Sequence, residues 1–259
     1  MAYSTIIKPN TQMNPLLYTG NTSNGHAITG LGFQPDFVWI KSRNQADFSH
    51  MLYDVVRTAV SGPFDIRSNA TNAQSTDSSG LVSFDSDGFT LNSGGYVNTG
   101  TFVSWNWKAG GSPSSNTDGS ITSSVSANTT NGFSIVKYTG NGSAGATIGH
   151  GLGSTPSAIF VKGLSAISNW SSYHSVLGNT GYMRLDGTGA FATASTYWNN
   201  TSPTSSVFTA GTTGNINANG NDFVAYCFAE KKGFSKFGSY VGNGNADGTF
   251  IYTGFKPAY

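Results

Sequence analysis

The sequence predicts an all-β protein built from tandem β-sandwich repeats of the jelly-roll or lectin-like kind, and three observations lead to this prediction. They are an internal repeat, strand-like alternation of apolar residues, and an unusual composition. The 259-residue chain contains 34 glycines, and 13% of its residues are aromatic. Many glycines combined with aromatic and β-branched residues are typical of short strands joined by tight turns.

The internal repeat is visible as motifs that recur in the same order. A third copy begins within residues 238–257, and the sequence then stops. Either the natural chain continues beyond Tyr259, which we favour, or the last segment packs on a neighbouring molecule. Ordered landmarks at nearly constant spacing indicate an internal duplication. The recurring segments, at offsets of 120 or 121, are YTGN at 18–21 and 138–141, VWIK at 38–41 with IFVK at 159–162, and FVSWNWKA at 102–109 with FVAYCFAE at 223–230.

The expected strands follow from apolar periodicity. Residues 102–109 alternate, so Val103, Trp105 and Trp107 share one face, which we expect to be the core face. The VWIK and IFVK segments are apolar on both faces, as central strands are. The Asp-Gly pair within residues 84–91 predicts a tight turn between two strands.

These elements divide the chain into parts. Residues 111–131 are rich in Gly, Ser, Thr and Asn and lack an apolar period, which is typical of a linker. We allow a short edge strand at 120–125 within it. The expected parts are an N-terminal arm at 1–15, a first β-sandwich at 16–110, the linker at 111–131, a second β-sandwich at 132–231, and an incomplete third repeat at 232–259.

Composition limits the partners and the location. Only 10% of residues are charged and the net charge is +1, which gives no electrostatic basis for binding nucleic acid. No apolar run is long enough to cross a membrane, and no secretory signal precedes the repeats. We therefore expect synthesis in a cytoplasm without membrane insertion.

The polar residues do not form a recognisable catalytic pattern. Glu230 is the only glutamate, whereas a glycosidase uses two opposed carboxylates. We therefore expect no enzyme activity and no cofactor, with a polysaccharide-degrading depolymerase as a distant alternative. Asp85 and Asp87 match part of a calcium loop, although a turn between strands requires the same residues. His26 and His150 are expected in solvent-facing turns.

Aromatic residues outside the patterned strands are candidates for a surface on which the sugars of a glycan stack, as in lectin-like sandwiches. These residues are Trp170, Tyr173, Tyr197 and Trp198.

The N-terminal arm is a candidate anchor to other proteins, because its apolar residues have no repeat core to join. Its prolines also extend the backbone and reduce the entropy lost on docking. The candidate anchoring residues are Ile6, Ile7, Pro9 and Met13.

The segments YTGN…ITGLGFQPDFVWIK, FDSDGFTLNSGG and YVNTGTFVSWNWKAGG resemble tandem domains of structural proteins from marine and cyanobacterial tailed bacteriophages. The opening MAYSTIIKPN and the segment from residue 227 to 257 resemble the same proteins. This resemblance implies a virion component, such as a tail fibre or appendage involved in host attachment, that binds other virion proteins through its arm. A capsid-bound head fibre or decoration protein is the alternative. Phage appendages are commonly trimeric, so the resemblance implies a homo-oligomer of three chains.

Overall fold

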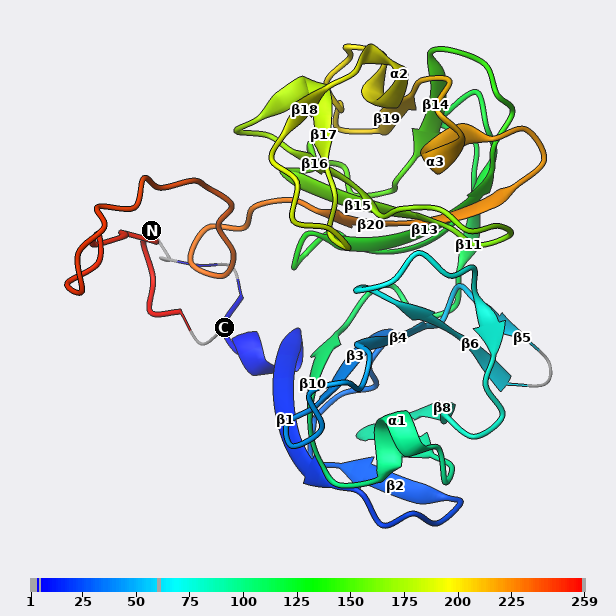
Figure 1. The fold of residues 1–259 in the computed structure, drawn as a ribbon, viewed down its shortest axis with the longest axis vertical. Coiled ribbons are helices and arrows are strands. Elements are labelled where there is room, and N and C mark those ends of the chain that lie inside the picture. Colours follow the sequence, from blue (N-terminus) through cyan, green and yellow to red (C-terminus); the bar gives the residue numbers. More distant parts are fainter. Residues whose placement is uncertain (1–3, 5, 60–61, 258–259) are drawn as a thin grey trace.

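The computed structural model describes residues 4, 6–59 and 62–257. These residues form four β-sheets that are stacked in layers, with the two large sheets in the middle and a small sheet at each end (Figure 1). The all-β prediction is confirmed, and the layered sheets belong to the β-sandwich class.

The first half of the chain, from β1 to β10, forms a seven-stranded sheet and a three-stranded sheet. The large sheet is ordered β1-β10-β3-β4-β6-β5, with β7 paired to β6. Its strands are β1 Met13–Thr19, β3 Phe37–Ser42, β4 Met51–Asp54, β5 Thr58–Ala59, β6 Gly62–Arg67, β7 Ser75–Thr76 and β10 Thr101–Trp107. The small sheet contains β2 His26–Thr29, β8 Leu81–Asp85 and β9 Gly88–Leu91, with the short helix α1 Gly95–Asn98 after it.

The second half, from β13 to β20, forms an eight-stranded sheet together with two strands that precede it. This sheet is ordered β11-β12-β13-β20-β15-β16-β17-β18. Its strands are β11 Ser114–Asn116, β12 Ser123–Asn128, β13 Phe133–Thr139, β15 Ala158–Gly163, β16 Ser171–His174, β17 Gly178–Met183, β18 Ala192–Thr193 and β20 Asp222–Phe228. The small sheet contains β14 Ala146–Gly149 and β19 Val207–Ala210, and the short helices are α2 Ser195–Trp198 and α3 Gly214–Asn217.

The same local contacts recur in the two halves. Tyr18 stacks on Phe102, with ring centroids 5.2 Å apart, and its hydroxyl donates to the Val97 carbonyl at 2.7 Å. In the second half, the Tyr138 ring stacks at 5.4 Å on Phe223 and its hydroxyl donates at 2.8 Å to the carbonyl of residue 216. The tyrosine of the YTGN motif therefore ties the first strand of each half to its last strand and last helix.

Three apolar cores separate the four sheets. One lies between the three- and seven-stranded sheets, and another lies between the eight- and two-stranded sheets. The third lies between the two large sheets and includes Phe37 and Leu52 from the first half with Phe133 and Tyr226 from the second. The two halves therefore share a core. The sequence analysis expected two separate domains joined by a linker and did not predict this shared core.

This shared core corrects the predicted core face of β10. The fully buried residues of this strand are Phe102, Ser104 and Asn106, while Val103, Trp105 and Trp107 are half-buried. Alternation identified the two faces correctly, but the bulkier face was taken as the core. Because the seven-stranded sheet is covered on both sides, its second face also carries large apolar residues.

The segment expected as a linker is part of the fold. Within 111–131, β12 pairs with β13 and β11 pairs with β12. The side chains of Ile121 and Val125 enter the core of the second half. The Ser123 hydroxyl, which composition alone would place in solvent, is buried and donates to the Gly149 carbonyl at 2.8 Å. Serines that bond to backbone oxygens can therefore occupy a buried strand without an apolar period.

The N-terminal segment also differs from the expected free arm. The 3₁₀ turn Pro9–Thr11 leads into β1, and Met13 lies opposite Trp107 in the sheet. Ile6 is buried, whereas Ile7 is 91% exposed. Of the expected anchoring residues, Ile7 and Pro9 are therefore exposed, whereas Ile6 is buried and Met13 is half-buried. Residues 1–3 and 5 lie outside the described residues.

Candidate functional site

The interface between the two large sheets is the most distinctive site of the described chain, and aromatic rings line it. Phe37 lies 4.6 Å from Tyr226 and 5.8 Å from Phe133, measured between ring centroids. Trp170 stacks on Tyr226 at 6.1 Å, and its indole N–H donates to the Arg67 carbonyl at 2.8 Å. Tilted and stacked rings at these distances attract one another in addition to burying apolar surface.

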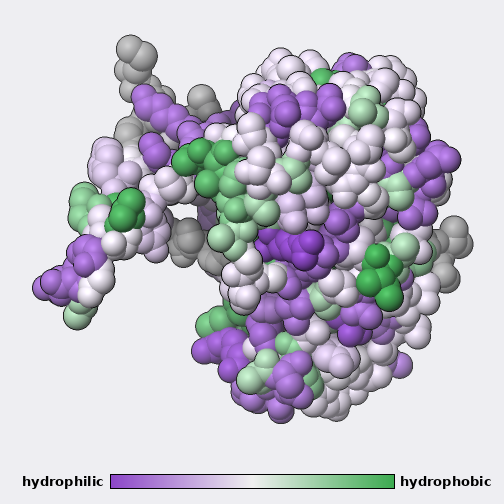
Figure 2. All heavy atoms as spheres, turned by 45° about the horizontal axis from the view of Figure 1, so that its top comes forward, coloured by the Kyte–Doolittle hydropathy of each residue, from purple (hydrophilic) through white to green (hydrophobic). Residues whose placement is uncertain are grey.

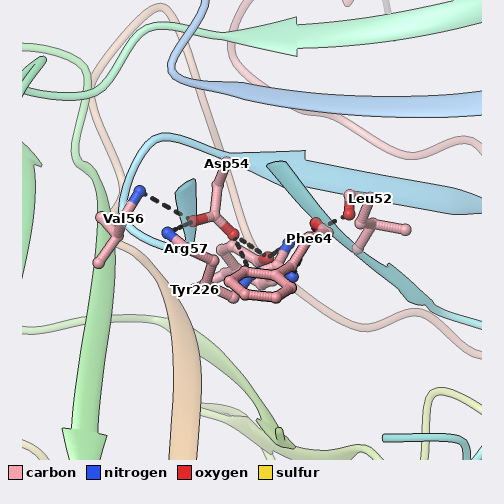
Figure 3. Close-up of polar contacts among 6 residues, drawn as sticks. All are labelled: Leu52, Asp54, Val56, Arg57, Phe64 and Tyr226. Carbon is pink, nitrogen blue, oxygen red and sulfur yellow. Dashed lines mark hydrogen bonds and ion pairs between the residues drawn. The ribbon is translucent and has the colours of Figure 1, made fainter. Parts of the chain in front are cut away.

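A buried charged group spans this interface (Figure 3). Arg57 Nε lies 2.6 Å from Asp54 Oδ2, and both side chains are almost completely inaccessible to solvent. Tyr226 Oη donates to the same carboxylate oxygen at 2.7 Å. The other oxygen, Oδ1, accepts hydrogen bonds from the backbone N–H groups of Val56 and Arg57. The Asp54 carboxylate is therefore satisfied by both halves of the chain.

Both terminal nitrogens of the Arg57 guanidinium also have partners. They donate to the carbonyls of Leu52 at 3.1 Å and Phe64 at 3.2 Å. Burial opposes the charge on Arg57, but the adjacent Asp54 carboxylate outweighs this effect, so the pKa of the guanidinium is raised. Burial likewise raises the pKa of the Tyr226 hydroxyl well above its ordinary value. The tyrosine therefore stays protonated at neutral pH and donates its hydrogen bond to Asp54.

A second polar contact joins the halves at Lys162. Its ammonium donates to the carbonyl of Thr71 from the first half at 2.9 Å and to the carbonyl of Ser168 at 2.5 Å. The side chain is fully buried, and this burial lowers the pKa of the amine to about 8. The related Lys41 bonds carbonyls of its own loop, including that of Phe48 at 2.7 Å. The equivalent lysines therefore have different roles: Lys41 stabilises a loop within the first half, and Lys162 joins the second half to the first.

A cavity of 580 Å³ opens at one end of the interface. Aromatic residues of both large sheets, including Trp39, Trp107 and Phe160, line it. Residues 233–237 and 253–257 of the C-terminal segment lie across it. Its wall is mainly apolar, and its size is within the range of small-molecule sites.

The four aromatic residues expected at a glycan-binding surface lie inside the protein instead. Trp170 belongs to the core between the large sheets, and Tyr173, Tyr197 and Trp198 belong to the core of the second half. The missed signal was the repeat itself. Tyr173 in β16 occupies the place of buried Tyr53 in β4, because each lies opposite the apolar central strand of its own half. The expected surface role is therefore wrong for these residues.

The aspartates of the partial calcium loop hold turns. Asp85 accepts hydrogen bonds from the hydroxyls of Ser83 at 2.8 Å and Thr90 at 2.7 Å. Asp87 accepts from the backbone N–H groups of Gly30 and Gly32. The two carboxylates serve different loops, and no group of three potential metal ligands occurs in the part of the chain that the structure describes.

His150, expected in an exposed turn, is fully buried. Its Nδ1 accepts from the backbone N–H of Leu152 at 3.2 Å, and its Nε2 lies 3.2 Å from the carbonyl of Thr204. These partners suit the neutral imidazole with a proton on Nε2. Burial lowers the pKa of His150, so the ring acts as a neutral bridge between loops. His26 is half-buried, and its Nδ1 lies 2.7 Å from the side chain of Asn98.

Sequence reasoning missed the Asp54–Arg57 pair altogether. The equivalent positions after Tyr173 hold His174 and Leu177, so the pair is a departure from the repeat. The available signal was that a charged pair stands at the end of β4 where the second half has His174 and Leu177. It could be recognised only once the two halves were known to be stacked.

The fold and the interface define a layered all-β protein whose two similar halves share an aromatic core with a buried ion pair. The chain belongs to the DUF7483 family, described as a domain of unknown function, because the family model matches residues 8–259. No curated protein and no solved structure matches the chain. Within the described residues, no helix is long and apolar enough to cross a membrane.

Proposed function

We propose that this protein is a non-catalytic structural component built from stacked β-modules, which serves as part of a phage tail fibre or similar virion appendage. The observation that carries the proposal is the interface between the large sheets. Its aromatic core and the Asp54–Arg57–Tyr226 group hold two similar modules in one fixed arrangement. Repeated modules that contact mainly their neighbours can build an extended structure from one stable unit.

The buried polar groups support a structural role over a catalytic one. Asp54 and Arg57 are shielded from solvent and satisfied by each other, by Tyr226 and by backbone groups. Their geometry favours one arrangement of the two modules. The phage setting and a trimeric state rest on the sequence resemblance.

Localisation in the particle tests this proposal. A tagged copy of the protein is expressed in cells infected by a phage that encodes it, and gold-labelled virions are then imaged by electron microscopy. We expect label on the tail. Label distributed over the capsid lattice would instead establish the head fibre or decoration role. Intact virions without label would overturn the proposal.

A further inference from the structure

The outer edge of β1 is uncovered, whereas the equivalent edge of β13 in the second half has a strand partner. In the second half, β13 is covered on the side away from β20 by β12, with Val125 opposite Val136. In the first half, β1 pairs with β10 in the equivalent register. Over residues 4, 6–59 and 62–257, no strand pairs with the other side of β1. The position equivalent to that of β12 is therefore open.

This difference changes the exposure of equivalent side chains. Val136 and Tyr138 are 0% and 2% exposed, whereas their counterparts Leu16 and Tyr18 are only half-buried. Leu17 is 62% exposed. An edge strand with exposed apolar residues is a site for pairing with another chain.

Alternation in β1 shows which groups point outward. The Gln12 carbonyl and the Gly20 N–H both bond to the β10 side, so the odd-numbered residues between them direct their backbone groups away from it. Pro15 has no N–H to offer there, as is usual on an edge strand. Met13, Leu17 and Thr19 therefore provide the outward donors, and the two adjacent ones, Leu17 and Thr19, lie in the C-terminal half of β1.

The C-terminal segment has the properties of such an added strand. Residues 249–253, with the sequence TFIYT, are β-branched or aromatic, which favours a strand. The described part of the segment, 238–257, forms no strand. Figure 2 shows apolar side chains on the part of the molecule that extends from the body. The exposed fractions are 67% for Tyr240, 85% for Val241, 86% for Phe250, 48% for Ile251 and 77% for Tyr252.

We propose that residues 249–253 of a second copy of this chain add a strand to the free edge of β1. The added strand covers the edge of β1 as β12 covers the edge of β13. It also buries apolar side chains that are exposed on β1 and on the C-terminal segment. Donor and acceptor are different parts of the chain, so the contact is head-to-tail and can continue from copy to copy. The inference goes beyond the proposed function, since it holds whether the protein lies on a tail or on a capsid.

Disulfide cross-linking between full-length variants tests the pairing. Leu17→Cys and Tyr252→Cys proteins are mixed under mild oxidation, and the products are resolved on non-reducing gels. The native Cys227 is buried and should not react. We expect a cross-linked dimer in the mixture, and no comparable product when Val176→Cys, an exposed position in the second half, replaces Leu17→Cys. Dimers of Leu17→Cys alone would indicate β1–β1 pairing and overturn the proposal, as would the absence of any cross-link.

Sedimentation equilibrium gives an independent measurement. The full-length wild type should associate as its concentration rises. The double variant Phe250→Asp/Tyr252→Asp should have a dissociation constant that is larger by about tenfold or more. Val176→Asp is the matched control and should leave association unchanged. A synthetic peptide of residues 238–257 should compete with association. Equal association of the wild type and the tail variant would contradict the role of the segment, and so would a wild type that stays monomeric.

Discussion

Tyr226 of β20 donates a hydrogen bond of 2.7 Å to the Asp54 carboxylate of β4, and so links strands that are 172 residues apart in the sequence. The same hydroxyl accepts a hydrogen bond from Arg57 at 3.4 Å. The contact joins the two halves at the centre of their shared core. It therefore offers a direct way to measure how strongly the halves depend on each other.

Replacing Tyr226 by Phe should destabilise the protein by about 1–3 kcal/mol, because the buried Asp54 carboxylate loses one of its donors. The measurement is urea unfolding followed by tryptophan fluorescence. Tyr240→Phe is the matched control, since Tyr240 is largely exposed and should leave the free energy of unfolding unchanged. Equal stability of both variants and the wild type would show that the hydroxyl does not hold the interface.

The Asp54–Arg57 pair should show strong coupling in a double-mutant cycle. Arg57→Met leaves a buried, unpaired carboxylate and should cost about 3–5 kcal/mol. Asp54→Leu should have a similar cost, because it leaves the buried Arg57 guanidinium without its carboxylate partner. The double variant should be more stable than either single variant, because no unpaired charge remains. Additive losses in the double variant would contradict this account.

Trp170→Ala should be more destabilising than Trp105→Ala. The Trp170 side chain is fully buried and its removal should cost about 3–5 kcal/mol. Trp105 is half-buried and packs edge-on against Trp39 at 6.1 Å. Chemical denaturation of the two variants measures the difference, and the reverse order of stability would show that β10 presents its other face to the core.

The free energy of unfolding should fall as pH is lowered from about 7 toward 5. Burial lowers the pKa of His150 from 6.5, and burial together with Lys41 lowers the pKa of His50. Below about pH 7 these histidines bind protons more readily in the unfolded chain than in the folded chain, so acid favours unfolding. His150→Gln should reduce this pH dependence, although it lowers stability at pH 7. A slope identical to that of the wild type would contradict the role of His150.

Cys227 should be unreactive in the folded protein. Burial raises the pKa of its thiol to about 12, and the side chain is fully enclosed. A chromogenic disulfide reagent at pH 8 should therefore modify the protein only when denaturant is added. Rapid modification without denaturant would show that the core of the second half opens readily.

The sequence alone predicted the all-β class, because strand formation depends on local alternation and turn residues. The Asp-Gly turn joins β8 and β9 as expected, with Asp85 opposite Gly88. The central strands β3 and β15 are largely buried, as their unbroken apolar runs predicted. The tyrosines of the repeated YTGN motif, Tyr18 and Tyr138, make equivalent contacts in the structure.

The candidate site was decided by tertiary structure, because burial depends on what covers a residue. Trp170 looked like a surface residue in an irregular segment, but the first half lies against it and the carbonyl of Arg67 accepts its indole proton. Asp54 and Arg57 carry no motif in the sequence, and Tyr226 from the other half completes their buried group. The face-to-face stacking of the two halves made both sites, and the local patterns that define strands do not encode which sheets will meet.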